Sequence, residues 1–249
     1  MRISVIMPAY NEEATLEPSV REVVAGLRIA NRDFEVIVVE NGSTDRTLAM
    51  ARRLAAEIPE LVVVEFPEAD YGRALRAGFL AADGDLVFNF DVDYFDLEFL
   101  ADAAIMMSGP DHSITDAGSA PEPPVVVVGS KRSAGAVDRR GISRRIVTAG
   151  FSFALRTLFR MRVSDTHGMK GLRREAIAPI VERCRFGTDL FDTELILRAE
   201  RAGLPVDEIP VEVTERRPSR TPIMRRIPRS VLGLLRLRLV FWREGRGAS

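Results

Sequence analysis

The alternation of short apolar runs with longer amphipathic segments constrains the fold of this chain more than any other feature. The runs that we predict to be strands are Ile3–Met7, Phe34–Val39, Leu61–Glu65, Leu86–Phe90 and Val125–Val128. Segments of helix length lie between them, at Leu16–Ala30, Asp45–Glu57, Gly72–Ala82 and Leu97–Met107. This order is typical of an α/β protein, so we predict a mainly parallel sheet flanked by helices.

Length and composition narrow the class of protein further. With 249 residues, 46% of them hydrophobic, the chain is long enough for one large α/β domain or two small ones. A single cysteine, Cys184, excludes an internal disulfide, and His112 and His167 are too few for a histidine-rich metal site. We find no signal peptide or membrane span and expect a cytoplasmic protein without a nucleic-acid partner.

Two acidic residues, Asp91 and Asp93, follow the apolar run Leu86–Phe90 and are separated by Val92. In an extended backbone, residues two apart point the same way, so a strand end here would aim both carboxylates at one point. Such a pair suits a divalent cation that is also bound by substrate phosphates, which predicts a phosphorylated or nucleotide-linked substrate. The alternative is a solvated turn without a ligand.

Further polar clusters follow the first two predicted strands. Ligands of open α/β sheets bind beyond the carboxyl ends of the strands, where Pro8-Ala9-Tyr10-Asn11-Glu12 and Glu40-Asn41-Gly42-Ser43 lie. We expect both clusters to converge with Asp91 and Asp93. The first cluster stands where a glycine-rich dinucleotide fingerprint would begin, which argues against a nicotinamide enzyme.

Basic residues gather in two stretches of the second half. The first contains Lys131, Arg132, Arg139, Arg140, Arg144 and Arg145, and the second contains Arg216, Arg217 and Arg220. Beside a metal and an acidic pocket, such clusters would suit a second substrate that carries a phosphate. Solvated helix faces would give the same pattern, and both interpretations stay open.

The segment Ile223–Trp242 mixes leucine, phenylalanine and tryptophan with arginine and is too charged to span a bilayer. A basic amphipathic helix of this kind suits the surface of an anionic membrane. A helix docked on the core, with its arginines facing water, is an equal alternative.

The order of these motifs resembles the family-two, inverting, GT-A-type glycosyltransferases, in particular the polyprenyl- or dolichyl-phosphate mannosyl- and glucosyltransferases. The segments that carry the resemblance are Val5–Glu13, Val38–Asp45, Gly72, Gly78, Gly84-Asp85 and Asp91–Asp93, followed by Gly129–Arg132, Asp165–Lys170, Phe191–Leu195 and Glu208–Val211. The resemblance implies a GT-A fold, a Rossmann-like nucleotide-diphospho-sugar transferase. It implies a catalytic domain at 1–222, with a nucleotide-sugar half at about 1–107 and an acceptor half at about 125–222, followed by a basic helix at 223–249.

The resemblance also implies roles for individual residues. The nucleotide sugar would be bound by Pro8, Tyr10, Glu12, Glu40, Asn41, Asp91 and Val92. Mg²⁺ or Mn²⁺ would be held by Asp91 and Asp93, and the acceptor phosphate by Lys131, Arg144, Arg216 and Arg220. Glu40-Asn41 replaces the pair of aspartates usual in the family, and Phe95 stands where mannosyltransferases often have glutamine.

These features predict a metal-dependent inverting enzyme that moves a hexose from GDP-mannose or UDP-glucose to a polyprenyl phosphate. A phosphate oxygen is already anionic at neutral pH and needs no general base, whereas a hydroxyl acceptor needs one. Asp192 lies where many family-two enzymes carry a catalytic E-D motif, so it is the candidate base for a hydroxyl acceptor, although it also suits the first turn of a helix. A nucleotide-sugar-binding protein without turnover is a second alternative. For the lipid acceptor we expect peripheral contact with the inner face of the plasma membrane.

Overall fold

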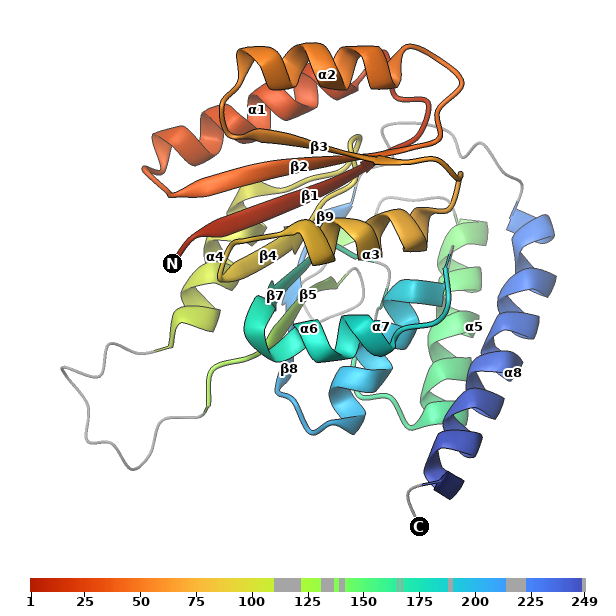
Figure 1. Cartoon of the computed structure of the whole chain (residues 1–249). Coiled ribbons are helices and arrows are strands. Elements are labelled where there is room, and N and C mark those ends of the chain that lie inside the picture. Colours follow the sequence, from red (N-terminus) through yellow and green to blue (C-terminus); the bar gives the residue numbers. More distant parts are fainter. Residues whose placement is uncertain are drawn as a thin grey trace, which may run out of the picture.

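The computed structural model describes residues 1–109, 122–130, 137–138, 142–164, 166, 168–187, 190–213 and 223–247. The side chains of 137–138, 142–148, 213, 223–230 and 245–247 are not described within these ranges. The elements are β1 (Ile3–Ala9), α1 (Leu16–Ile29), β2 (Phe34–Asn41), α2 (Thr47–Glu57), β3 (Leu61–Phe66), α3 (Tyr71–Ala81), β4 (Leu86–Asn89), α4 (Leu97–Ser108), β5 (Val126–Ser130), β6 (Val137–Asp138), α5 (Ile142–Phe159), β7 (Lys170–Arg173), α6 (Arg174–Arg183), α7 (Phe191–Arg201), β8 (Val206–Pro210), β9 (Glu212–Val213) and α8 (Ile223–Gly247) (Figure 1).

One seven-stranded sheet in the order β3-β2-β1-β4-β7-β5-β8 forms the centre of the molecule, and β6 pairs with β9 beside it. Strands β1 to β4 are parallel, with Val5 opposite both Val36 and Phe88, and β5 is parallel to β8. The predicted α/β fold with a mainly parallel sheet is confirmed. Strand β7 is the exception, because it runs antiparallel between β4 and β5 and joins the two parallel sets.

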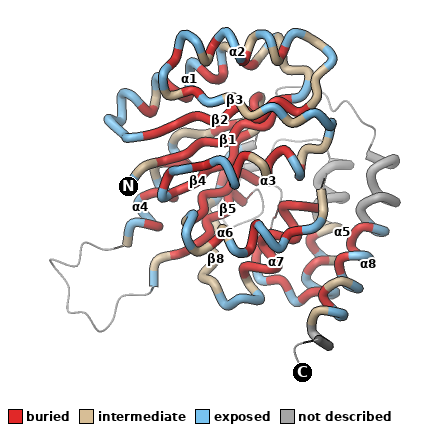
Figure 2. Tube along the Cα trace, in the orientation of Figure 1, coloured by how far each residue is buried: buried red, intermediate tan, exposed pale blue. Residues whose placement is uncertain are grey.

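Helices cover both faces of this sheet, and the apolar side chains form two clusters (Figures 1 and 2). One cluster packs α1, α2 and α4 on the face that contains Val5, Val36 and Phe88. The other packs α3 and α5 to α8 on the face that contains Ile6 and Ile37. Successive strand residues point to opposite faces, so a strand that is buried on both sides reads as a continuous apolar run.

Helix α8 docks on the core by one face. Its Leu234, Leu237 and Phe241 are buried, and the Phe241 ring lies 6.1 Å from the ring of Phe159 in α5. The sequence alternative of a docked terminal helix is therefore correct for this face. In the part of the chain that the structure describes, no helix has the length and apolar character needed to cross a bilayer.

Candidate active site

The segment that carries Asp91 and Asp93 is a tight turn at the carboxyl end of β4. The backbone N–H of Asp91 donates to the Tyr94 carbonyl and the Tyr94 N–H donates to Asp91, both at 3.1 Å. The expectation that an extended strand presents both carboxylates is therefore wrong. Burial of Val92 sets the direction of the two acidic side chains instead. Val92 packs in the core, while both aspartates stay partly exposed. The hydrophobic effect that anchors Val92 thus turns the acidic residues toward solvent.

Tyr71, the first residue of α3, binds one of these carboxylates. Its hydroxyl donates to Asp91 Oδ1 at 3.0 Å. Burial raises the pKa of Tyr71 well above its ordinary value, and the negative charges of Asp91 and Asp192 raise that pKa further. The phenol therefore stays protonated near neutral pH and remains a donor to Asp91. No sequence motif singled out Tyr71, although its place directly after a loop at the carboxyl edge of the sheet was a usable signal.

Lys170 and Asp192 form a buried ion pair in the same region. Lys170 is fully buried on β7, Asp192 is 5% exposed in the first turn of α7, and Lys170 Nζ lies 3.0 Å from Asp192 Oδ1. The ammonium also donates a hydrogen bond to the Gly168 carbonyl at 2.7 Å, and its contact with Asp192 Oδ1 is an ion pair that lacks hydrogen-bond geometry. Next to Lys170 in the sheet, Asn89 of β4 is buried with no hydrogen-bond partner for Oδ1 among the described residues. Sequence analysis assigned no role to Lys170 or Asn89.

The N-termini of α3 and α7 lie against each other, which brings Tyr71 near Asp192. A Cβ atom added to Gly187, shortly before α7, would lie within 2.5 Å of both carboxylate oxygens of Asp70. The ring of Phe79, two turns into α3, lies 6.1 Å from the ring of Phe191, the first residue of α7. The glycine allows the Asp70 carboxylate to lie close to the backbone before α7, and this contact brings the two halves of the sheet together at one site.

The loop after β2 is held by its own side chains. Glu40 is buried and accepts a hydrogen bond from the Ser43 N–H at 2.6 Å, while the buried Asn41 accepts from the Asp70 N–H at 2.9 Å. Gly42 has φ 64°, and a Cβ there would lie 2.7 Å from the Pro67 carbonyl oxygen, which explains the glycine. Glu40 and Asn41 thus build the loop at the carboxyl edge. Their proposed contact with the nucleotide remains a prediction.

The loop after β1 lies against the loop after β2. Asn11 has φ 55°, its N–H donates to Ser43 Oγ, and its side-chain oxygen accepts from the Thr44 N–H. Pro8 is buried in β1, Tyr10 is 39% exposed, and the Glu12 carboxylate accepts from Thr15 at the start of α1. Tyr10 is the member of this predicted set whose ring is most open to a ligand. Glu12 stabilises the beginning of α1, and its contact with the nucleotide sugar stays a prediction.

Comparison with known proteins identifies the family. Residues 4–178, more than half of the chain, match the family described as Glycosyl transferase family 2. The chain belongs to glycosyl transferase family 2. It is therefore a transferase on the fold that the sequence predicted.

Two relatives match this glycosyltransferase over only part of their own length. Glycosyltransferase AglD of Haloferax volcanii is 30% identical over 85% of this chain, which covers 33% of AglD. An undecaprenyl-phosphate 4-deoxy-4-formamido-L-arabinose transferase of Pseudomonas paraeruginosa is 38% identical over 36% of this chain and 27% of its own length. The chain thus spans about a third or less of these relatives.

A solved structure matches most of the chain. Glucosyl-3-phosphoglycerate synthase of Mycobacterium tuberculosis, determined with Mn²⁺, uridine diphosphate and phosphoglyceric acid, has a TM-score of 0.64 and 25% sequence identity. The match covers 95% of this chain and 78% of that one. The GT-A fold is thereby shown for this glycosyltransferase.

The donor set of the glycosyltransferase fits a divalent cation bound together with a substrate. Asp91 and Asp93 are two partly exposed carboxylates in one turn, and the described residues contain no group of three or more metal-binding side chains. Mg²⁺ commonly binds through one or two carboxylates and completes its coordination with waters and substrate phosphates, and Mn²⁺ prefers the same oxygen ligands. Two carboxylates are therefore a sufficient protein contribution to such a site.

The predicted basic residues cannot be placed beside this site. Lys131, Arg216 and Arg220 lie outside the described residues, and Arg144 lies in α5 where only the backbone is described. Their role in binding an acceptor phosphate stays a prediction.

Proposed function

We propose that this glycosyltransferase moves a hexose from a nucleotide sugar, GDP-mannose or UDP-glucose, to a polyprenyl phosphate, with Mg²⁺ or Mn²⁺ and with inversion at the anomeric carbon. The likeness to an undecaprenyl-phosphate transferase supports the acceptor class. Structural likeness to a synthase that binds Mn²⁺ and a uridine nucleotide supports the donor class and the cation.

The buried Lys170–Asp192 pair is the observation that favours a phosphate acceptor over a hydroxyl acceptor. A general base must reach the proton that it removes, directly or through one water. Asp192 is nearly inaccessible, and its charge is already balanced by Lys170 at 3.0 Å. A phosphate acceptor needs no proton removed, so the arrangement favours it over a hydroxyl.

The residues of the chain then have distinct tasks. Asp91 and Asp93 would hold the cation, and Tyr71 would fix the orientation of Asp91 through its hydrogen bond. Once bound, the cation would offset the charge that develops on the leaving nucleoside diphosphate. The Lys170–Asp192 pair would hold the N-terminus of α7 against the sheet.

A hydroxyl acceptor is the second candidate, and the match to a synthase that binds phosphoglyceric acid favours it. In that case Asp192 would exchange its contact with Lys170 for the acceptor hydroxyl. The third sequence hypothesis, a protein without turnover, is disfavoured by membership of a transferase family.

The test incubates purified protein and Mn²⁺ or Mg²⁺ with radiolabelled GDP-mannose or UDP-glucose and polyprenyl phosphate in detergent. Label extracted into organic solvent measures transfer. We expect metal-dependent label, which Asp93→Ala reduces at least about 100-fold, because a catalytic cation contributes several kcal/mol. The circular dichroism spectrum should be unchanged because Asp93 is partly exposed. Full transfer by Asp93→Ala would contradict the metal assignment.

Asp192→Asn distinguishes the two acceptors. With a phosphate acceptor, we expect transfer to stay within about 10-fold of the wild type after correction for the folded fraction. Loss of a general base would cost about 10²–10⁴-fold. A loss of that size, together with transfer to phosphoglycerate in place of polyprenyl phosphate, would replace our proposal by the hydroxyl-directed enzyme.

A further inference from the structure

Helix α8 has a second apolar face that points away from the core. Its exposed apolar side chains are Val231 (52%), Leu232 (49%), Leu235 (56%), Leu239 (44%) and Trp242 (49%). At about 100° per residue, positions 231, 235, 239 and 242 form one stripe along the helix. We call these five side chains the outer stripe of α8. The buried residues Leu234, Leu237 and Phe241 lie on the opposite side.

A docked amphipathic helix normally directs polar side chains toward water. The outer stripe does the reverse over about three turns of helix. Figure 1 shows α8 beside α5 at the margin of the molecule, with its outward side uncovered by any drawn element. An extended apolar surface of this kind marks an interaction site.

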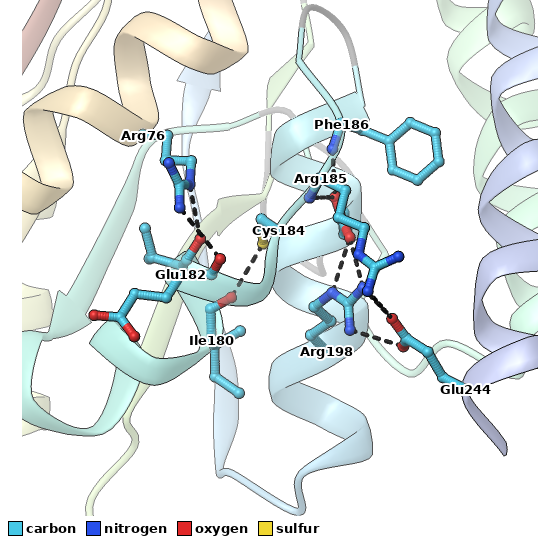
Figure 3. Close-up of polar contacts among 10 residues, drawn as sticks. Arg76, Ile180, Glu182, Cys184, Arg185, Phe186, Arg198 and Glu244 are labelled. Carbon is cyan, nitrogen blue, oxygen red and sulfur yellow. Dashed lines mark hydrogen bonds and ion pairs between the residues drawn. The ribbon is translucent and has the colours of Figure 1, made fainter. Parts of the chain in front are cut away.

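An ion-pair network fixes which face of α8 points outward. Glu244 of α8 accepts two hydrogen bonds from Arg198 of α7, at 2.9 and 3.0 Å (Figure 3). Arg198 also donates to Glu194. Arg198 is 5% exposed and Glu194 is fully buried. Rotation of α8 to hide the outer stripe would break these contacts and leave Arg198 partly unpaired in the core, which is strongly unfavourable.

The charge around the outer stripe selects the kind of partner. Arg236, Arg238 and Arg243 are exposed on the same helix. Glu244 is the only acidic residue between 223 and 247, and its carboxylate is paired with Arg198. An apolar stripe with arginines at its margins and one tryptophan complements anionic lipid headgroups above acyl chains. Arginine can keep its guanidinium at the headgroups while its stem lies along the apolar surface.

We propose that the outer stripe of α8 lies in the interface of an anionic bilayer and holds the enzyme there. This surface extends the proposed function, since it would place the site where a lipid-phosphate acceptor resides, and it rests on that function for its biological meaning. The binding itself requires neither donor nor acceptor. The sequence alternatives of docking and membrane contact are therefore compatible, because they use opposite faces of one helix.

The experiment is co-sedimentation of the full chain with vesicles that contain neither nucleotide sugar nor polyprenyl phosphate. We expect binding to vesicles of phosphatidylglycerol and phosphatidylcholine that exceeds binding to pure phosphatidylcholine at least 10-fold, and that weakens as salt screens the arginines. Leu235→Ser with Trp242→Ser should weaken binding at least 10-fold. The control is Leu80→Ser with Ile105→Ser, since Leu80 is 50% and Ile105 65% exposed on other helices.

Equal binding by the outer-stripe variant and the wild type, or no preference for anionic vesicles, would overturn the proposal. Sedimentation velocity tests the competing occupant, a second copy of the chain. A dimer that the outer-stripe variant dissociates, without vesicle binding by the wild type, would assign the surface to self-association and also overturn the proposal. Transfer in detergent is scored separately, so vesicle binding without transfer would remove the lipid-phosphate function and leave the surface in place.

Discussion

The two halves of the site are held together by different interactions. Around β1 to β4, the loops at the carboxyl edge are joined by hydrogen bonds, such as those of Asn11 to the Thr44 N–H and of Asn41 to the Asp70 N–H. Around β7 and α7, the structure relies on buried charges, namely Lys170 with Asp192 and Glu194 with Arg198.

This difference predicts different tolerances to the loss of one interaction. A hydrogen-bonded loop tolerates the loss of one bond for about 1 kcal/mol. A buried charge that loses its partner costs about 3–5 kcal/mol, because it stays desolvated without compensation. The second half should therefore be the less tolerant to substitution.

The largest effect on stability should come from Glu194→Gln. Glu194 is fully buried and accepts from Arg198 and from the N–H groups of Arg185 and Phe186. Its neutralisation leaves Arg198 with Glu244 alone, so we expect a loss of about 3–5 kcal/mol in the free energy of unfolding. Denaturant titration followed by circular dichroism measures it.

The matched control is Arg52→Gln in the first half. Arg52 makes two hydrogen bonds with Glu65, but both side chains are about half exposed, at 60% and 48%. We expect this substitution to lower the free energy of unfolding by less than about 1 kcal/mol. Equal losses for the two variants would break the distinction between the halves.

The next effect should be on cation affinity. Tyr71→Phe removes the hydrogen bond to Asp91 and leaves the ring in place. Partners of metal ligands typically contribute about 10–100-fold to affinity, so we expect Mn²⁺ binding with a nucleoside diphosphate to weaken by that factor. Electron paramagnetic resonance of free Mn²⁺ measures it without turnover. Unchanged affinity would show that the turn orients Asp91 unaided.

A smaller loss of stability than that of Glu194→Gln should come from Glu244→Gln, and this loss should depend on pH. Hydrogen bonds from Arg198 lower the pKa of Glu244 below its ordinary value. A depressed carboxyl pKa contributes stability above the unfolded pKa near 4.5, and this contribution is lost as pH falls through the folded pKa. We expect the free energy of unfolding of the wild type to exceed that of the variant by about 1–2 kcal/mol at pH 7, and this difference to vanish as pH falls through the lowered pKa of Glu244. A difference that does not decline as pH falls would assign the effect to packing.

Local patterns predicted the first half well. The apolar runs gave β1 to β4 to within a few residues, because strands buried on both faces leave a continuous signal. In the second half, the apolar run Val125–Val128 also predicted β5, but β7 and α6 departed from these rules. Lys170-Gly171-Leu172-Arg173 forms β7, yet its basic residues hide the strand, and α6 contains Pro179.

The site was predicted in the same uneven way. Asp91, Asp93 and Asp192 were given roles from the sequence, but Tyr71 and Lys170 were not, because their importance lies in partners 20 or more residues away. The backbone conformation that carries the two acidic side chains was also misjudged. An extended strand was assumed, whereas the buried Val92 holds a turn.

The bond between Arg198 and Glu244 joins residues 46 positions apart. Synthesis on the ribosome proceeds from the N-terminus, so Arg198 is made before Glu244, whose carboxylate accepts two of its hydrogen bonds. Strands β1 to β4 can pair in the order in which they emerge, but α7 reaches its final stability only after α8 has left the exit tunnel. Until α8 has emerged, Arg198 therefore lacks one of its two carboxylate partners. At this stage the nascent second half would be most accessible to chaperones or proteases.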